Sequence, residues 1–177
     1  YSSIGHIGFT LAGISTNTTT GYSSSIVYIS IYVVMSLGIF SCIFLMKRDG
    51  KYCENLNDLS GISKSHPILS FSLLIILFSL AGIPPLAGFF AKFYIFMAVI
   101  ESKMYMLAII GLLSTIISAF YYLRIIKIIY FDDASKSFDQ IKNLGISITL
   151  FLSSIILITF FVYPSFLNTI VEKLIIN

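Results

Sequence analysis

The sequence contains few charged residues, no tryptophan and only two cysteines among its 177 residues. Charged residues make up 11% of the chain, against about 25% in a typical soluble domain, and hydrophobic residues make up 57%. This composition excludes a disordered chain and argues against a soluble globular domain. The absence of a dense lysine and arginine stripe argues against a nucleic-acid partner. Cys42 and Cys53 match no metal-ligand spacing and are too few for a disulfide framework.

Motifs of redox and nucleotide chemistry are also absent from the sequence. There is no cysteine cluster for an iron–sulfur centre, no haem attachment motif and no glycine-rich nucleotide loop after a strand. No nucleophile stands with a base in a recognisable catalytic pattern. We therefore expect the chain to bind no cofactor and no metal, and any chemistry it performs to concern ions or protons.

Long apolar runs are what the sequence does contain. They fall at 1–15, 22–46, 67–101, 105–130 and 144–163. A helix needs about 20 residues to cross roughly 30 Å of hydrocarbon. The pattern predicts an all-α polytopic membrane protein, with about five transmembrane helices in a single membrane domain over residues 1–177. The first run covers only about 22 Å as a helix, so we expect its N-terminal part to be missing from this sequence.

The third run, 67–101, is interrupted in its middle by Pro84 and Pro85, which Gly82 and Gly88 flank. Adjacent prolines remove two backbone donors and clash with the preceding turn. Glycine loosens the chain further. The run therefore forms either a hairpin of two short helices or one crossing that is broken near residues 82–88.

The positions of the basic residues favour a single broken crossing. The segments 47–66 and 124–142 are the two most basic connections, and they fall on the same side of the membrane only if the run between them crosses once. Lysine and arginine concentrate on the cytoplasmic side of membrane proteins. We therefore predict one broken crossing, with both basic segments in the cytoplasm or in the matrix of a mitochondrion.

Lys92 is the only lysine or arginine well inside an apolar run. A charged side chain at mid-membrane costs about 2.5–3.5 kcal/mol on insertion scales. Lys92 could be a packing residue paired with a backbone carbonyl, or a titrating group beside a polar cavity. The break favours the second interpretation, because an interrupted helix exposes carbonyls at the negative end of its dipole. Broken helices with an ionisable residue are typical of ion-coupled transporters.

Weaker candidates are found in the other runs. His6, between Gly5 and Gly8, could relay protons or could be a polar packing residue, and the sequence does not decide. His66 precedes Pro67, which indicates the start of a helix. Tyr121, Tyr122, Arg124 and Lys127 close the fourth run, and we expect them to form an interfacial belt of aromatic and basic side chains.

Four stretches of the sequence resemble one family. The stretch LAGIPPLAGFFAKFY at 80–94 is similar to the broken-helix signature of the antiporter-like membrane subunits of respiratory complex I. The stretches 1–8, 58–61 and 118–124 resemble a helix of that family, the loop before its broken helix and the helix after it. The resemblance covers about residues 1–130. Lys92 followed by Phe93 and Tyr94 points to the branch called subunit 2 in mitochondria and N in bacteria.

The resemblance implies an antiporter-like subunit fold, of which this chain supplies the C-terminal half. It implies a membrane-arm subunit of the proton-pumping NADH:ubiquinone oxidoreductase without a redox centre of its own. Lys92 would be the protonation site of a half-channel, with His6 as a weaker relay. Alternatives are a structural, non-conducting subunit, or a subunit of a multi-subunit cation/proton antiporter.

The implied partners are other membrane-arm subunits, lipids, and a chain or missing segment that supplies the N-terminal half of the fold. The implied location is the mitochondrial inner membrane, with the bacterial plasma membrane as the alternative. The high content of isoleucine, phenylalanine, tyrosine, serine and asparagine fits an AT-rich genome of either origin.

Overall fold

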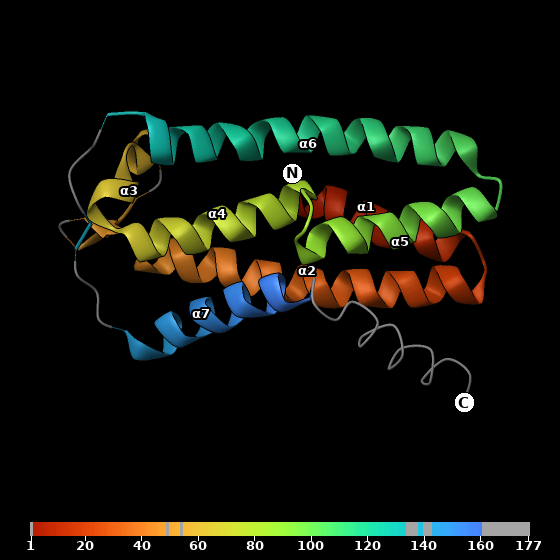
Figure 1. Ribbon diagram of the computed structural model, residues 1–177, viewed down its shortest axis with the longest axis horizontal. Coiled ribbons are helices and arrows are strands. Elements are labelled where there is room, and N and C mark those ends of the chain that lie inside the picture. Colours follow the sequence, from red (N-terminus) through yellow and green to blue (C-terminus); the bar gives the residue numbers. More distant parts are fainter. Residues whose placement is uncertain (1, 49, 54, 134–137, 140–142, 161–177) are drawn as a thin grey trace.

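The computed structural model describes residues 2–48, 50–53, 55–133, 138–139 and 143–160 and shows a bundle of roughly parallel and antiparallel helices (Figure 1). The helices are α1 (Ser2–Ser15), α2 (Thr19–Leu45), α3 (Ile62–Ser65), α4 (Pro67–Ala81), α5 (Ala87–Glu101), α6 (Tyr105–Phe131) and α7 (Leu144–Thr159). The fifth predicted run extends to residue 163, and its last three residues lie outside the described part.

The long helices match the predicted membrane class. α2 and α6 each have 27 residues and are apolar enough to cross a membrane. α4 and α5 have 15 residues each, so each covers about 22 Å and neither crosses alone. They follow one another in the same direction along the bundle, and the break lies midway (Figure 1). The prediction of one broken helix over 67–101, rather than a hairpin, is confirmed.

Local sequence explains where the helices begin and end. The Thr18 side chain caps α2 by accepting a hydrogen bond of 3.0 Å from the Gly21 amide. α4 begins at Pro67, as the sequence predicts, because proline at the first helical position gives up no hydrogen bond. Asn143 caps α7 in the same way as Thr18, through the Ile146 amide at 3.4 Å.

α2 is the central helix of the bundle and packs against α1, α4, α5 and α7. Apolar burial contributes little to helix association in lipid, so close packing of small residues matters more. At Gly38 a Cβ atom would lie 2.8 Å from Ile76 and 3.2 Å from Ser153, so this glycine lets α4 and α7 approach α2. α6 lies at the edge and presents an exposed apolar face that includes Ile116, Ile117 and Phe120.

The basic segment 47–66 contains structure that the all-α prediction did not include. Its first part is a two-stranded antiparallel hairpin of β1 (Lys47–Arg48) and β2 (Lys51–Tyr52), in which Arg48 pairs with Lys51. A 3₁₀ helix, η1 (Leu56–Leu59), follows it. Strands of two residues are too short to show alternation, although the Asp49–Gly50 dipeptide between them is a turn signal in the sequence.

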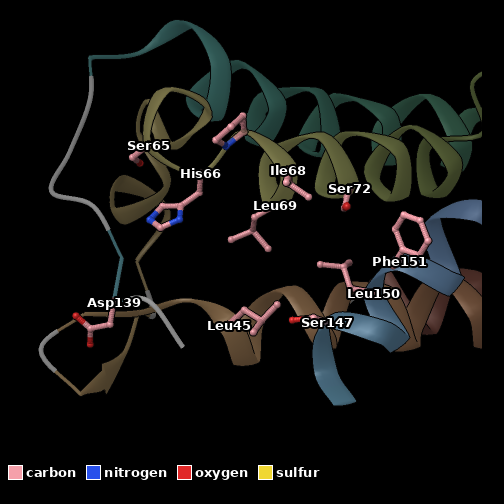
Figure 2. Close-up of a pocket in the computed structure, with 11 residues that line it drawn as sticks. Leu45, Ser65, His66, Ile68, Leu69, Ser72, Asp139, Ser147, Leu150 and Phe151 are labelled. Atoms are coloured by element: carbon pink, nitrogen blue, oxygen red, sulfur yellow. The ribbon is translucent and has the colours of Figure 1, made fainter. Parts of the chain in front are cut away.

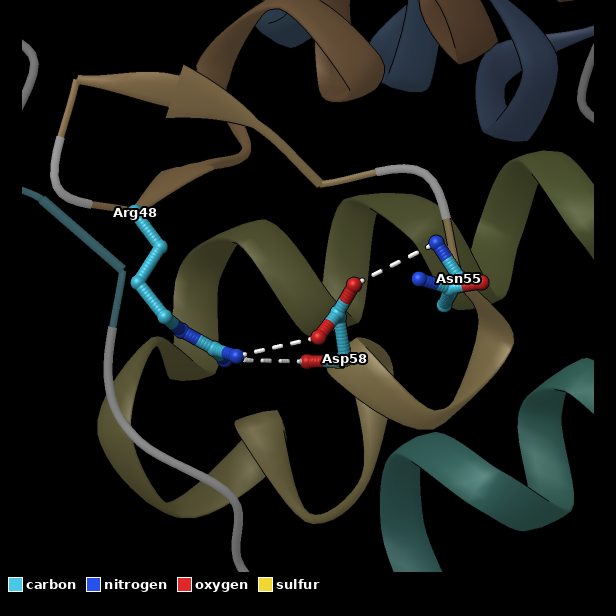
Figure 3. A network of polar contacts seen from close by, with 3 residues as sticks. All are labelled: Arg48, Asn55 and Asp58. Carbon is cyan, nitrogen blue, oxygen red and sulfur yellow. Dashed lines mark hydrogen bonds and ion pairs between the residues drawn. The ribbon is translucent and has the colours of Figure 1, made fainter.

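An ion pair joins the hairpin to the 3₁₀ helix (Figure 3). Arg48 Nη1 lies 3.0 Å from Asp58 Oδ1, and Arg48 Nη2 donates to the Asp58 carbonyl at 3.3 Å. The other carboxylate oxygen of Asp58 accepts from the Asn55 amide at 3.2 Å. Both side chains of the pair are partly exposed, so its contribution to stability is about 0–1 kcal/mol. Its main effect is to fix the loop that leads into α4.

Candidate functional site: a buried lysine at the helix break

The break itself consists of residues 82–86, between the end of α4 and the start of α5. Gly82 caps α4 in the left-handed conformation, with φ of 82°, which favours glycine. Pro84 and Pro85 follow, and the peptide bond between them is cis. Pro84 and Pro85 are exposed on the surface of the described part of the chain, whereas Gly88 is buried.

A helix leaves its last four carbonyls without partners inside the helix, and here each of the four has an identified donor. The Gly82 amide reaches the carbonyls of Phe78 and Ser79, and the Ile83 amide also reaches that of Phe78. Lys92 Nζ donates to the other two, Leu80 O at 3.0 Å and Ala81 O at 3.1 Å. Lys92 on α5 therefore supplies the hydrogen-bond donors for the last two carbonyls of α4.

Close packing of glycines brings the two half-helices together. A Cβ atom on Gly88 would lie 1.8 Å from the Ser79 carbonyl oxygen, and the Gly88 amide donates to Ser79 Oγ at 3.0 Å. A Cβ atom on Gly82 would lie 3.0 Å from Lys92 Cδ. Gly88 and Lys92 are one helical turn apart, so both are on the face of α5 that meets the end of α4. The glycines thus set the distance that the lysine side chain must cover.

Lys92 is only 5% exposed, yet it lines a cavity of about 210 Å³ between α1, α5 and α6. The polar residues around this space, which we name the lysine cavity, are Ser2, His6, Lys92, Ser114, Ser118 and Tyr121. A water molecule takes up about 30 Å³ in the liquid, so the cavity has room for several. Lys92 Nζ also lies 5.4 Å from the centre of the Phe9 ring, within cation–π range. Lys92 therefore lies at a cavity whose lining is mostly apolar and includes several polar side chains.

His6 lines the same cavity from α1 and is 4% exposed. Both of its ring nitrogens have phenol partners: Nδ1 lies 2.8 Å from the Tyr28 hydroxyl and Nε2 lies 3.2 Å from the Tyr122 hydroxyl. Its ring also stacks on Tyr32, at 4.7 Å between centroids. The two residues singled out from the sequence, Lys92 and His6, are therefore brought together at one cavity.

The expectation of an interfacial belt at the end of the fourth run is wrong for two of its members. Tyr122 is 4% exposed and bonds to His6 inside the bundle, and Tyr121 is half-buried and lines the lysine cavity. Arg124 is exposed, and Lys127 pairs with Asp132, so these two are surface residues. The sequence gives no separate signal for a buried tyrosine here, because tyrosine is common both at interfaces and in polar cores.

His66 lies far from this site, at a second pocket of about 350 Å³ between α4 and α7 (Figure 2). Its Nε2 accepts a hydrogen bond of 3.1 Å from the Phe138 amide, and its ring stacks on Phe138. Asp139 lies at the edge of the same pocket and accepts from the Gly50 amide at 2.9 Å. His66 thus holds the segment before α7 against the start of α4, and it does not reach the lysine cavity.

The described residues form no metal site beside this cavity. Within the described ranges, no group of three or more histidine, cysteine, aspartate or glutamate side chains could hold a metal ion. The described elements of the site are therefore an amine, an imidazole, phenols and serine hydroxyls. These groups can bind and pass protons, and they offer no ligand set for redox chemistry.

A discontinuous helix with a buried lysine at its break defines the class, a polytopic membrane protein of the antiporter-like type. Residues 1–118 match the model of the family described as "NADH:quinone oxidoreductase/Mrp antiporter, TM". The chain belongs to this family, which confirms the resemblance drawn from residues 80–94.

Two bacterial relatives illustrate the similarity in sequence. The chain is 60% identical over 174 residues to NADH-quinone oxidoreductase subunit N of Pelagibacter ubique, and 47% identical over 165 residues to that of Parvibaculum lavamentivorans. These alignments cover 98% and 93% of the chain, so the similarity extends past residue 130, where the motif-based resemblance ended. They cover only 37% and 34% of the relatives, so the chain spans little more than a third of their length.

Two solved structures show the fold. A chain of respiratory complex I from Thermus thermophilus superposes with a TM-score of 0.80 at 23% identity, over 96% of this chain and 38% of that one. A chain of the Mrp complex from a Dietzia species superposes with a TM-score of 0.81 at 18% identity, over 97% and 40%. At these identities the similarity establishes the antiporter-like fold, of which this chain is a part.

Proposed function

We propose that the chain is the C-terminal part of a membrane-arm subunit of a proton-translocating NADH:quinone oxidoreductase. The support is its similarity to relatives named subunit N. Electron transfer would take place in other subunits, and this chain would need no cofactor. The relatives named above are bacterial, which lends no support to the mitochondrial location expected first, so we propose the bacterial plasma membrane.

Within this function, Lys92 would be the protonation site of a half-channel, and the observation that carries this is its hydrogen bonding. The ammonium group is held by the Leu80 and Ala81 carbonyls, at the negative end of the α4 dipole. Burial in the bundle opposes this and favours the neutral amine. A lysine between two such influences can load a proton and release it into the lysine cavity. His6, which lines the same cavity, would be the next group to interact with that proton.

A second function for this fold, a subunit of a cation/proton antiporter, implies different partners from those of the oxidoreductase. A subunit of a cation/proton antiporter would assemble only with other membrane subunits, whereas a subunit of the oxidoreductase would assemble with flavin and iron–sulfur proteins. Affinity purification of the tagged full-length protein from its own membranes, in mild detergent, tests this. We expect flavin absorbance and NADH:quinone reductase activity in the purified complex. Purification with membrane subunits alone would contradict the proposal and favour the antiporter.

A structural, non-conducting subunit is the third possibility, and Lys92 argues against it. A purely structural role would use Lys92 only as the donor to the Leu80 and Ala81 carbonyls, and the insertion cost of a buried amine is better explained by a group that also titrates. Replacement of Lys92 in the assembled complex decides between the structural and conducting roles, through the ratio of protons pumped to NADH oxidised.

The lysine cavity also predicts what lies next to α1. A space with a buried amine and an imidazole, open toward lipid between α1 and α6, would be energetically unfavourable. We expect a second polypeptide, or a further part of the same one, to pack against residues 1–46 and to present at least one intramembrane glutamate or lysine to the cavity. A structure of the intact assembly is the measurement. Helices α1 and α2 facing only lipid, with no ionisable neighbour, would refute this prediction and the proton-transfer role.

A further inference from the structure

Three tyrosines surround His6, and two of them bond to it. Tyr28 on α2 is 1% exposed and its hydroxyl meets Nδ1 at 2.8 Å. Tyr122 on α6 meets Nε2 at 3.2 Å, and its hydroxyl also bonds to Ser2 Oγ. Tyr32 stacks on the imidazole, and the described contacts give it no hydrogen bond to His6. The chain of hydrogen bonds therefore runs from the core, through the histidine, to a serine at the lysine cavity.

The direction of the Tyr28–His6 hydrogen bond depends on which acceptors the buried Tyr28 hydroxyl can reach. In a neutral imidazole one nitrogen donates and the other accepts. Among the described residues, His6 is the only hydrogen-bond partner of the Tyr28 hydroxyl. If His6 donated from Nδ1, the Tyr28 hydroxyl hydrogen would be buried without an acceptor, which is unfavourable. If Tyr28 donates to Nδ1, then Nε2–H donates to Tyr122, and the hydrogens of both Tyr28 and His6 have acceptors.

We propose that Tyr28 is a positioning residue that holds His6 as the Nε2–H tautomer. This inference deepens the proton-transfer function proposed above and rests on it. With Nδ1 accepting from Tyr28, the His6 ring presents Nε2–H to the Tyr122 hydroxyl, which also bonds to Ser2 at the lysine cavity. Tyr28 never contacts the cavity itself and acts only through His6.

The contrast with His66 provides an internal standard. His66 Nε2 accepts from the backbone amide of Phe138, so His66 must carry its proton on Nδ1 when neutral. The two histidines of this chain are thus expected to be opposite tautomers. Nitrogen-15 NMR distinguishes a protonated ring nitrogen from an unprotonated one, and separates both neutral tautomers from the doubly protonated ring.

The experiment uses the full-length subunit, labelled with ¹⁵N-histidine, in lipid bilayers. His6→Gln and His66→Gln identify the two signals by their disappearance. We expect Nε2–H for His6 and Nδ1–H for His66. Tyr28→Phe keeps the buried ring and removes only the hydroxyl, so an Nδ1–H population of His6 should appear. Tyr32→Phe removes a hydroxyl next to the same imidazole and should leave the His6 signal unchanged.

An unchanged His66 signal in Tyr28→Phe shows that the fold is intact, so the His6 signal can be interpreted. A His6 ring that is Nδ1–H or doubly protonated in the unmodified protein overturns the proposal, and so does a Tyr28→Phe spectrum identical to that of the unmodified protein. In the assembled complex, Tyr28→Phe should lower proton pumping per NADH by about two- to tenfold, the size expected for loss of one orienting hydrogen bond. Tyr32→Phe should pump normally.

Pumping by Tyr28→Phe equal to that of Tyr32→Phe would overturn the positioning role. The proposed function fails separately, if a complex with Lys92→Met pumps normally. In that case the NMR result would still show that Tyr28 fixes the tautomer of His6, but the tautomer would have no role in proton transfer. The two failures are therefore distinguishable.

Discussion

Lys92→Met in the assembled complex is expected to lower proton pumping per NADH by about tenfold or more, because a positioned proton-transfer group contributes roughly 10²–10⁴-fold to its step. Methionine is unbranched and of similar length, so it fills the space of the lysine stem without a titratable group. NADH:quinone reductase activity in uncoupled membranes should persist, because no redox group is removed. The measurement is proton uptake into inverted membrane vesicles, against NADH oxidation in the same preparation.

Two further variants separate the titration of Lys92 from its structural contribution. Methionine leaves the Leu80 and Ala81 carbonyls without their donor, at a cost of about 1–3 kcal/mol for each group that water does not reach. Lys92→Arg restores donors and positive charge, but a guanidinium remains protonated at any physiological pH. We therefore expect Lys92→Arg to assemble better than Lys92→Met and still to pump poorly.

The matched control is Lys103→Met, the same change at an exposed position in the turn between α5 and α6. It should pump and assemble normally. Normal pumping by Lys92→Arg would show that a fixed charge suffices and would contradict a titrating lysine. Normal pumping by Lys92→Met in a fully assembled complex would remove the protonation site altogether and leave the structural role.

The broken helix and its lysine could be predicted because both depend on local chemistry. Pro84 and Pro85 cannot continue a helix wherever they stand, and a lysine inside an apolar run is unfavourable in any fold. The sequence could not show that Lys92 Nζ reaches the Leu80 and Ala81 carbonyls. That contact depends on the angle between two half-helices, which the close approach at Gly88 sets.

The phenol partners of His6 could not be predicted, because they depend on tertiary packing. Tyr122 and His6 are 116 positions apart, and nothing in either neighbourhood signals the other. Tyr122 stands close to Arg124 and Lys127, a pattern that favours an interfacial position. The chain contains 11 tyrosines, so residue type alone could not single out Tyr28 and Tyr122. The hairpin at 47–52 is a different case, because its pairing lies within the segment and the Asp49–Gly50 dipeptide between the strands is a local turn signal.

Gly88→Ala is expected to destabilise the subunit strongly, because the new methyl group would meet the backbone of the other half-helix. The new Cβ would lie 1.8 Å from the Ser79 carbonyl oxygen and 2.7 Å from its carbon, far inside van der Waals contact. Because the obstacle is backbone, α4 and α5 must move apart at the break. Overpacking of a core costs about 1–3 kcal/mol and occasionally more, and a backbone clash belongs at the upper end of that range.

The displacement should also reach Lys92, one turn further along α5. Its Nζ is within hydrogen-bond distance of two carbonyls at the end of α4, and its Cδ lies close to Gly82. If the half-helices separate, these bonds lengthen, and the lysine loses the groups that hold its ammonium form. We therefore expect Gly88→Ala to reduce both the amount of assembled complex and the pumping per NADH of whatever assembles. The amount is measured by native electrophoresis of solubilised membranes, and stability by the midpoint of thermal inactivation.

Two variants test whether steric contact is the cause. In Gly145→Ala the new Cβ meets only Asn143 Oδ1 at 3.6 Å, an ordinary contact in the first turn of α7, so this variant should assemble normally. Ser79→Ala removes the acceptor of the Gly88 amide but adds no atom, so the half-helices need not move apart, and it should cost about 1 kcal/mol, well below Gly88→Ala. If Gly88→Ala assembles as well as Gly145→Ala, the half-helices are not in the close contact that positions Lys92. If Ser79→Ala is as damaging as Gly88→Ala, the hydrogen bond rather than the close approach is what holds the break together.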